Sequence, residues 1–203
     1  MDKIVEEQLL GEELHLGNKI DIIGSFGAGK TILALQLGEI LKTPVFHLDC
    51  YFWLPGWKEK PGDVRIKVLE GLVQQEQWII EGAYLRLFEP RLNAADTVIF
   101  LDMSTWLCLK RIFYRYFKDR RPRPDLPAGC SSNLNLWRIG KVLFFRVRHH
   151  KELSQKLHSY ESSKQVIRLH SEKEIESFLR QQQQEANEKM NSHTSDSAVG
   201  ALA

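Results

Sequence analysis

A glycine-rich segment followed by a lysine and a threonine is the part of this sequence best suited to chemistry. It reads Gly24-Ser25-Phe26-Gly27-Ala28-Gly29-Lys30-Thr31, which matches the spacing GxxxxGK[ST]. Glycines let successive backbone N–H groups turn toward phosphate oxygens, and the start of a following helix adds partial positive charge. In such a loop Lys30 reaches the β- and γ-phosphates, and the Thr31 hydroxyl can ligate Mg²⁺. These eight residues are therefore predicted to bind a nucleotide, with Thr31 as a metal ligand.

Three carboxylates, Asp49, Glu81 and Asp102, each follow a short apolar run of the kind found in buried strands. Ligands bind at the carboxyl ends of parallel strands. Asp49 is interpreted as a base for an acceptor hydroxyl or a holder of Mg²⁺-bound water, with a turn cap as the alternative. Glu81 is the candidate carboxylate that bonds water on the metal. For Asp102 a role at a helix start is favoured over a metal role, and His47 is interpreted as a half-buried strand residue.

A basic stretch lies between Lys110 and Lys151, with twelve basic and only two acidic residues. Arg111 and Arg115 share one face of an expected helix, and Arg121 begins a proline-broken segment that is expected to be a loop. An arginine loop over bound phosphates would stabilise negative charge and exclude water. A solvated basic face and a nucleic-acid surface are the alternatives. Beside a phosphate loop, the pattern favours an arginine-rich lid over residues 115–135.

Short apolar runs rich in β-branched residues alternate with segments of helical periodicity. The runs are Ile20–Ile23, Val45–Leu48, Trp78–Ile80, Thr97–Leu101 and Val166–Leu169. Strands that alternate with helices predict βαβ units and a parallel sheet covered on both faces. The expected fold is α/β with three layers, in a single domain over residues 18–180. Residues 1–17 form an acidic extension, and residues 181–203 are expected to be disordered because they contain little apolar surface.

Composition excludes several classes of protein. The chain has 203 residues, 43% hydrophobic and 27% charged, with a net charge of +2, which is typical of a globular domain. It lacks an apolar run long enough to span a membrane and a secretory leader, so a cytoplasmic protein without a membrane partner is expected. The three widely spaced cysteines suggest neither disulfides nor a zinc site. The NKxD letters at 18–21 precede the phosphate loop, so they do not indicate a GTPase.

Four stretches together resemble the topology modulation (FlaR-like) proteins, a group of P-loop kinase-like proteins related to nucleoside monophosphate kinases. The stretches are Val45–Trp57, Trp78–Arg86, Ala95–Arg111 and the RPRPDL run from Arg121. The resemblance covers about residues 18–180. It implies a five-stranded parallel sheet with a lid, ATP as the nucleotide, and kinase activity on an unsettled substrate. It also implies that Arg111 lies near the base and Arg115 on the phosphates, and that Asp49 corresponds to the strand-two aspartate of uridine-kinase-like enzymes.

Two departures from that family bear on the acceptor. Members commonly have Asp-Gly-Asn-Tyr-Ser where this chain has Glu81-Gly82-Ala83-Tyr84-Leu85, so the acid is one methylene longer and two polar side chains are absent. Ile32 replaces the hydroxyl residue usual after the loop threonine.

Three functions are consistent with these residues. The first is transfer of the γ-phosphoryl group of ATP, with Mg²⁺ on Thr31 and Asp49 as base, to a nucleotide, a nucleoside or another small hydroxyl acceptor. In this function Lys30, Asp49, Arg115 and Arg121 would be catalytic. The second is an ATP-binding regulator of DNA topology or a nucleic-acid binder without turnover. The third is a nucleotide-binding protein that has lost kinase activity. The kinase is the favoured prediction, with its acceptor unnamed by the sequence.

Overall fold

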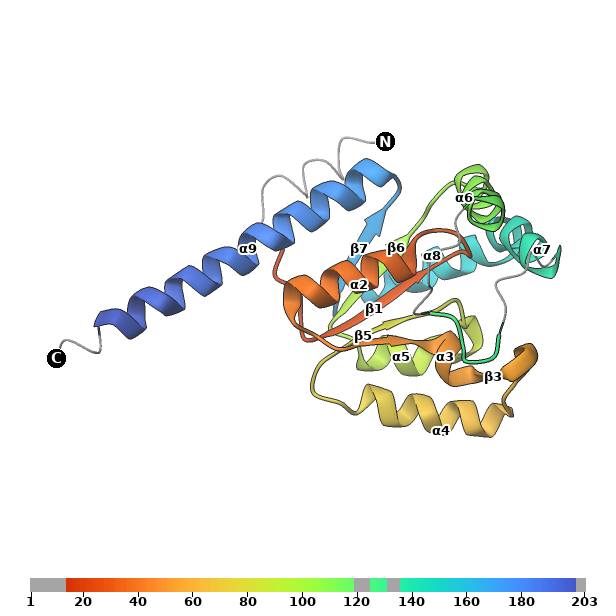
Figure 1. Ribbon diagram of the computed structural model, residues 1–203, viewed down its shortest axis with the longest axis horizontal. Coiled ribbons are helices and arrows are strands. Elements are labelled where there is room, and N and C mark those ends of the chain that lie inside the picture. Colours follow the sequence, from red (N-terminus) through yellow and green to blue (C-terminus); the bar gives the residue numbers. More distant parts are fainter. Residues whose placement is uncertain (1–13, 119–124, 131–135, 200–203) are drawn as a thin grey trace.

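Five parallel strands form the central sheet of the computed structural model, which describes residues 14–118, 125–130 and 136–199 (Figure 1). The strand order is β2-β5-β1-β6-β7, with every pair parallel. The strands are β1 (Lys19–Gly24), β2 (Val45–His47), β5 (Trp78–Glu81), β6 (Thr97–Leu101) and β7 (Gln165–Leu169). All five strands predicted from the sequence are therefore confirmed, with ends that differ by at most one residue.

Helices follow the strands, as the periodicity predicts. They are α2 (Lys30–Leu41), α3 (Leu48–Phe52), α4 (Gly62–Val73), α5 (Phe88–Ala94), α6 (Thr105–Phe117), α7 (Leu136–Phe144), α8 (His150–Tyr160) and α9 (Glu172–Val199). Shorter elements are the antiparallel pair β3 (Trp53–Leu54) and β4 (Lys58–Glu59), the 3₁₀ turns η1 (Pro55–Trp57) and η2 (Leu85–Leu87), and a π-helical segment η3 (Phe145–His149). In the described part of the chain, no helix has the length and apolar character to cross a membrane.

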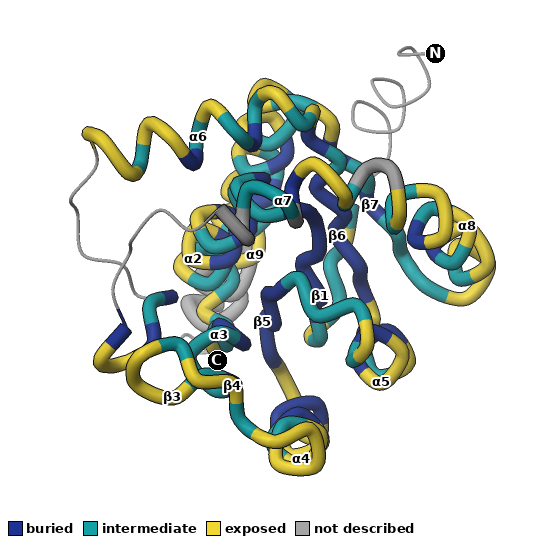
Figure 2. The backbone as a smooth tube through the Cα atoms, turned by 90° about the vertical axis from the view of Figure 1, so that its right-hand side faces the viewer, coloured by how far each residue is buried: buried dark blue, intermediate teal, exposed yellow. Residues whose placement is uncertain are grey.

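The sheet is buried on both faces because alternate strand residues pack against different helices. Ile22 and Ile99 belong to one apolar cluster, which includes side chains of α2, α6, α7 and α9. Ile80 and Phe100 belong to a second cluster with α3, α4, α5 and α8. The central strands are accordingly buried along most of their length, and the exposed positions lie on the outer sides of the helices (Figure 2). The three-layer α/β fold expected from the sequence is thus the fold observed.

Helix α9 differs from the disordered segment expected from residue 181, because it continues to Val199. Its first turn is fixed by Ser171, whose hydroxyl accepts a hydrogen bond from the Glu174 amide at 3.2 Å. Phe178 is buried against α2, and Gln182 is buried and donates to the Leu14 carbonyl at 3.2 Å. Once a helix is nucleated, each further residue costs little, and the Gln, Glu and Ala residues of this segment favour helix. Low apolar content alone therefore does not predict whether this segment is helical.

A fully buried ion pair joins β1 to α5 inside the second apolar cluster. Arg91 donates from Nε to Asp21 Oδ1 at 3.0 Å, and its Nη2 donates to the same oxygen. Its Nη1 donates to the Gly82 carbonyl at 3.2 Å, just after β5 ends. Burial raises the pKa of Asp21, and the Arg91 charge opposes that rise. The pair therefore fixes the chain that leaves β5, where the candidate site begins.

Removing one partner of this pair should destabilise the fold strongly. Arg91→Met leaves the Asp21 carboxylate buried without its charge partner, which typically costs about 3–5 kcal/mol of unfolding free energy. The double variant Asp21→Leu, Arg91→Met removes both charges and should recover most of that loss. Urea unfolding of the two variants and the wild type measures both effects. A loss below about 1 kcal/mol in Arg91→Met, well under the usual cost, would show that the pair is not structurally important.

Candidate active site

The glycine-rich segment connects β1 to α2 and lies at the carboxyl edge of the sheet. The Ala28 amide donates to the Ser25 carbonyl at 3.2 Å, which closes the first turn of the loop. Gly27 has a φ of 80° and packs directly against α6, where an added Cβ would lie 2.5 Å from the Cys108 carbonyl oxygen. Gly29 has a φ of 106° and precedes the first residue of α2. The two glycines with positive φ therefore allow the tight turn between β1 and α2 that the glycine spacing predicts.

Lys30 lies over this loop with only 7% of its surface exposed. Its Nζ donates to the Ser25 carbonyl at 2.9 Å and lies 5.7 Å from the centre of the Phe26 ring. Burial lowers the pKa of Lys30, while the carboxylates of Glu81 and Asp49 act to raise it. The Lys30 ammonium group is therefore largely removed from water, and a bound anion would stabilise its charged form.

The Thr31 hydroxyl and the Glu81 carboxylate meet where β1 and β5 end. Thr31 Oγ1 donates to Glu81 Oε1 at 3.2 Å, and His47 Nδ1 lies 3.1 Å from the same oxygen. The register explains this meeting, since Glu81 pairs with Ile22 on β1 and with His47 on β2. His47 is buried, rather than half-buried as expected, and contacts the candidate metal carboxylate.

These oxygens fit a magnesium ion. Mg²⁺ prefers oxygen ligands and is commonly held by one or two carboxylates together with substrate phosphates. Thr31 and Glu81 supply such oxygens beside the phosphate loop, and Asp125 Oδ2 lies 3.5 Å from Thr31 Oγ1. Among the residues that the structure places, no three His, Cys, Asp or Glu side chains form a metal cluster by themselves.

Asp49 lies in the first turn of α3, opposite the phosphate loop. Tyr84 donates its hydroxyl to Asp49 Oδ1 at 2.5 Å, and Trp53 Nε1 donates to the Tyr84 oxygen at 2.6 Å. Because the Tyr84 oxygen already accepts from Trp53, its own proton is directed to Asp49. Burial, followed by the nearby Asp49 charge, raises the pKa of Tyr84. The phenol therefore stays protonated and fixes the orientation of the carboxylate.

Arg111 and Arg115 both come from α6, the helix predicted to carry them on one face. Arg111 Nη1 donates to the Ala28 carbonyl at 2.6 Å, and its Nη2 donates to Glu172 Oε1 at 2.7 Å. This arginine therefore braces the loop backbone and links it to the start of α9. Arg121 and most of the expected lid lie outside the described residues.

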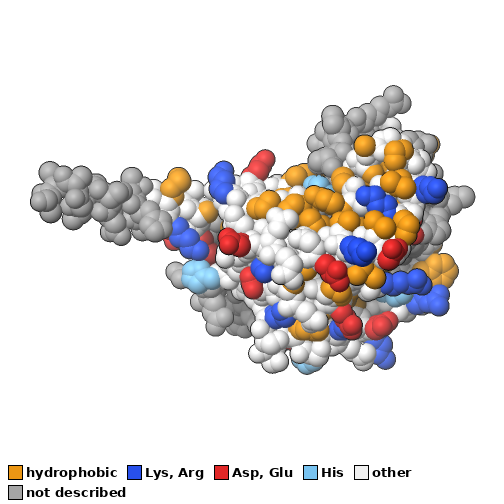
Figure 3. Space-filling view, turned by 90° about the horizontal axis from the view of Figure 1, so that it is seen from below, with side chains coloured by type: hydrophobic (Ala, Val, Ile, Leu, Met, Phe, Trp, Pro, Cys, Tyr) orange, Lys and Arg blue, Asp and Glu red, His pale blue; other side chains and the backbone are white. Residues whose placement is uncertain are grey.

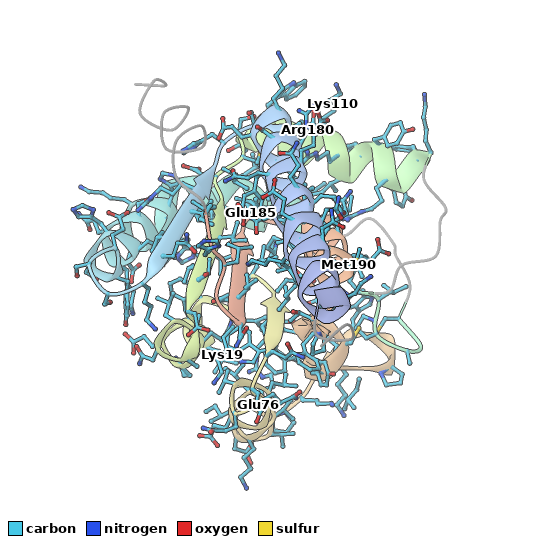
Figure 4. All side chains as sticks on the ribbon, turned by 90° about the vertical axis from the view of Figure 1, so that its left-hand side faces the viewer. Lys19, Glu76, Lys110, Arg180, Glu185 and Met190 are labelled. Carbon is cyan, nitrogen blue, oxygen red and sulfur yellow. The ribbon has the colours of Figure 1, made fainter. Side chains whose placement is uncertain are left out.

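One cavity of about 590 Å³ contains most of these groups. Nine predicted site residues line it: Phe26, Gly27, Gly29, Lys30, Thr31, Asp49, Glu81, Arg111 and Arg115. Three others, Gly24, Ser25 and Ala28, are buried in the loop and are absent from the cavity lining. Apolar residues Leu107, Ile175 and Leu179 line another part of the wall. Figure 4 shows Lys110, which also lines the cavity, near the top of the view, and Lys19, at the start of β1, in its lower half.

Asp102, the third carboxylate at the end of a strand, lies outside the cavity lining. Its Oδ2 lies 2.8 Å from His150 Nε2 of α8. Ser104 caps α6 by accepting from the Leu107 amide at 3.2 Å. The helix start expected after Asp102 is thus present, with Ser104 as its cap.

Sequence reasoning did not single out Tyr84, Asp125, Glu172 or Arg91. Tyr84 stands within the stretch that resembles the topology modulation family, and Asp125 stands within the RPRPDL run interpreted as lid. Their roles depend on contacts with residues 35 and 94 positions away, which no local pattern encodes.

Of the comparisons with known proteins, the comparison with solved structures found matches. No family model matches the sequence, and no curated protein is similar to it. A shikimate kinase from Bacteroides thetaiotaomicron is 20% identical, with a TM-score of 0.50 over 81% of this chain and 96% of that chain. The chain has the P-loop kinase fold.

Other solved structures in the same comparison are also kinases. A deoxyadenosine kinase from M. mycoides is 18% identical, with a TM-score of 0.47 over 85% of this chain and 98% of that chain. A shikimate kinase from Acinetobacter baumannii is 18% identical, with a TM-score of 0.46 over 87% and 93%. Because no family model matches, the resemblance to the topology modulation family is supported only by the sequence stretches that carry it.

Replacing Lys30 should stabilise the protein without nucleotide. Because burial lowers its pKa in the folded state, the charged amine opposes folding below that pKa. Lys30→Met should therefore melt at a higher temperature than the wild type at pH 7. This destabilisation by the charged amine decreases as pH rises from the folded-state pKa of Lys30 toward the ordinary value of 10.5. The difference in melting temperature between the two proteins should therefore decrease over that pH range.

Thermal unfolding from pH 7 to pH 10.5 measures this gap. Lys67→Met, at an exposed position on α4, is the control for loss of one lysine charge. Mg·ATP at about 100 times its Kd should stabilise the wild type by about 2.7 kcal/mol. The same concentration should stabilise Lys30→Met much less. Equal ligand-induced shifts in both proteins would contradict a phosphate role for Lys30.

Proposed function

We propose that the protein transfers the γ-phosphoryl group of ATP to a hydroxyl group of a small acceptor. The acceptor is a nucleotide, a nucleoside or another small hydroxyl compound. The observation that supports this proposal is that Asp49 and the phosphate loop line the same cavity. The P-loop kinase fold adds support, since loop and acceptor carboxylate come from the edge of the sheet where such folds bind ligands.

The chemistry assigned to the chain's own residues is positioning and charge stabilisation. The loop amides and Lys30 hold the β- and γ-phosphates, and Arg115 adds positive charge from α6. Thr31 and Glu81 hold Mg²⁺, which neutralises phosphate charge when it is bound. Arg121 is proposed to reach the same phosphates from a lid over residues 115–135.

Asp49 is proposed as the general base. Its carboxylate accepts the acceptor's hydroxyl proton as the acceptor oxygen bonds to the γ-phosphorus, and the bond from that phosphorus to the β,γ-bridging oxygen breaks to release ADP. Tyr84 holds the carboxylate in one orientation through its 2.5 Å hydrogen bond. Trp53 in turn holds Tyr84, so the antiparallel pair β3–β4 supports the base from behind.

Asp49→Asn should lower phosphoryl transfer by about 10²–10⁴ while ATP affinity changes by a few-fold at most. The amide keeps the shape of the side chain and loses its capacity to accept the proton. The assay measures ADP release across a panel of nucleosides, nucleotides and small polyhydroxy compounds. Full activity in Asp49→Asn would make Asp49 a turn cap. Absence of transfer to every acceptor, with intact ATP binding, would favour the nucleotide-binding protein without turnover.

Tyr84→Phe should have a smaller effect that depends on pH. Loss of the donor makes protonation of the Asp49 carboxylate easier, so the acid limb of the pH–rate profile should move to higher pH. The fall in kcat should therefore be largest at low pH and partly recovered at high pH. Phe46→Leu, on β2 outside the cavity, is the control for a changed aromatic residue. A kcat that falls equally at every pH would contradict the positioning role.

ATP-dependent binding of nucleic acid is the second candidate function, and α6 favours it. Five exposed aromatic residues lie on this helix, with Lys110 among them and Lys118 directly after its end: Trp106, Phe113, Tyr114, Tyr116 and Phe117. Aromatic rings between cations suit stacking on bases along a phosphate backbone. On the face seen in Figure 3, by contrast, acidic and basic side chains are interspersed.

A salt series separates the two functions. If the kinase proposal is correct, binding of labelled duplex DNA should be weak, independent of sequence and largely lost at physiological salt. Fluorescence titration between low salt and about 150 mM, with and without ATP, measures this. Submicromolar, ATP-dependent binding at the higher salt would favour the regulator of DNA topology that the family resemblance suggests.

A further inference from the structure

An aromatic stripe runs along the side of α6 that faces away from the core. Cys108 and Ile112 of this helix are buried in the apolar cluster shared with α2 and α7. By contrast, Trp106, Phe113 and Phe117 are 77%, 40% and 68% exposed. In Figure 2, α6 lies at the edge of the molecule, with exposed positions along its length. The helix is therefore apolar on two sides, and only one of these sides packs in the described core.

The spacing of the stripe is that of a seam between two helices. Its residues, 106, 110, 113 and 117, are separated by four, three and four positions, which places them in one line along α6. Such steps are those of the a and d positions of a coiled coil, where each side chain packs between residues of a facing helix. Lys110 is the one cation of the stripe; it is exposed and also lines the cavity. The place of this lysine decides which partner fits.

The stripe is complementary to itself when two copies lie antiparallel. A two-fold axis at its midpoint places Trp106 opposite Phe117 of the partner subunit. The same axis places Lys110 opposite Phe113 of the partner subunit, and an ammonium group is attracted to the face of an aromatic ring. A parallel pair would instead place two lysines opposite each other, which like-charge repulsion disfavours. We propose that α6 pairs with α6 of a second copy of this chain in the antiparallel register.

The same lysine disfavours a membrane surface as the partner. An interfacial helix keeps its charged face apart from the apolar face that enters the lipid, whereas Lys110 lies within the aromatic stripe. Stacking on nucleic-acid bases, the second candidate function, requires the same rings to stay uncovered. Self-association and nucleic-acid binding through α6 therefore exclude each other.

The exposed area of α6 predicts a weak dimer. Because an aromatic side chain has about 150–250 Å² to bury, the five exposed aromatic residues of this helix offer about 500–600 Å² per copy. Exposed apolar patches of this size on monomeric proteins are often functional. Two copies would bury about 1,000–1,200 Å² together, which is at the lower limit for a specific interface and typical of transient complexes. We therefore expect dissociation in the micromolar range.

Exchange of two stripe residues tests the register. Sedimentation of the full chain between about 1 μM and 1 mM, the range of weak association, should show a monomer–dimer equilibrium. Phe113→Lys places lysines opposite each other at two symmetric points, and should weaken the dimer by about 10-fold or more. The double variant Lys110→Phe, Phe113→Lys restores one lysine opposite one ring, and should recover the wild-type dissociation constant to within a few-fold. Ile66→Lys, at an exposed apolar position of α4, is the matched control and should dimerise as wild type.

Trp106 and Phe117 provide a second measurement that adds no charge. Because the two side chains face each other across the proposed pair, Trp106→Ala and Phe117→Ala should each weaken the dimer by about 10-fold. Combining them should weaken it by much less than the product of the two effects, since substitutions of contacting residues are not additive. Circular dichroism and thermal unfolding check that each variant is folded.

Every outcome supports or overturns this dimer, and none depends on kinase activity. A wild type that stays monomeric up to about 1 mM would overturn it, as would equal association of Phe113→Lys and Ile66→Lys. Additive losses in the Trp106 and Phe117 variants, or a folded double variant that fails to recover, would overturn the antiparallel register. If the wild type is monomeric and Phe113→Lys binds duplex DNA or anionic vesicles more tightly, the stripe belongs to that partner instead.

Discussion

The candidate site depends on the register of β5 between β1 and β2. Glu81, the last residue of β5, pairs with Ile22 on one side and with His47 on the other. That register brings one carboxylate within hydrogen-bond distance of both Thr31 and His47. Because side chains alternate between the faces of a sheet, a shift of one residue would turn Glu81 to the opposite face. The Asp21–Arg91 pair also fixes the end of β5, because Arg91 donates a hydrogen bond to the Gly82 carbonyl directly after the strand.

Local sequence patterns predict those features of the structure that depend on residues close together in the chain. The five strands, the phosphate loop and the helix carrying Arg111 and Arg115 all follow from periodicity and spacing, and the fold they predict is the one observed. Asp125 could not be found this way, because its partner Thr31 is 94 residues distant and its position is set by packing on β3–β4. The helix over residues 181–199 differs from the predicted disorder for a related reason. Its order begins with Phe178 and Gln182, which pack on distant parts of the chain.

The site carries a surplus of negative charge around a single buried lysine. Asp49, Glu81 and Asp125 all line the cavity with Lys30, and burial lowers the pKa of that lysine despite two of these neighbours. Such a set of groups is costly in the absence of ligands, because each charge has lost water. Under the proposed function, a bound cation and phosphates would lower this cost. In that function, these carboxylates favour a metal-bound polyanion, while Lys110, Arg111 and Arg115 on the same wall attract its phosphates.

Helix α9 sets the overall proportions of the molecule. Its 28 residues correspond to a rod about 42 Å long, which is about the full diameter of a compact domain of this size, whose radius of gyration is about 17 Å. Figure 1 shows its later turns extending away from the sheet. Rotational diffusion in solution is consequently anisotropic, with fast spinning about the rod axis and slow tumbling end over end. Amide groups will relax at rates that depend on their angle to that axis, so the N–H bonds of α9, aligned with it, will differ from those of helices that cross it.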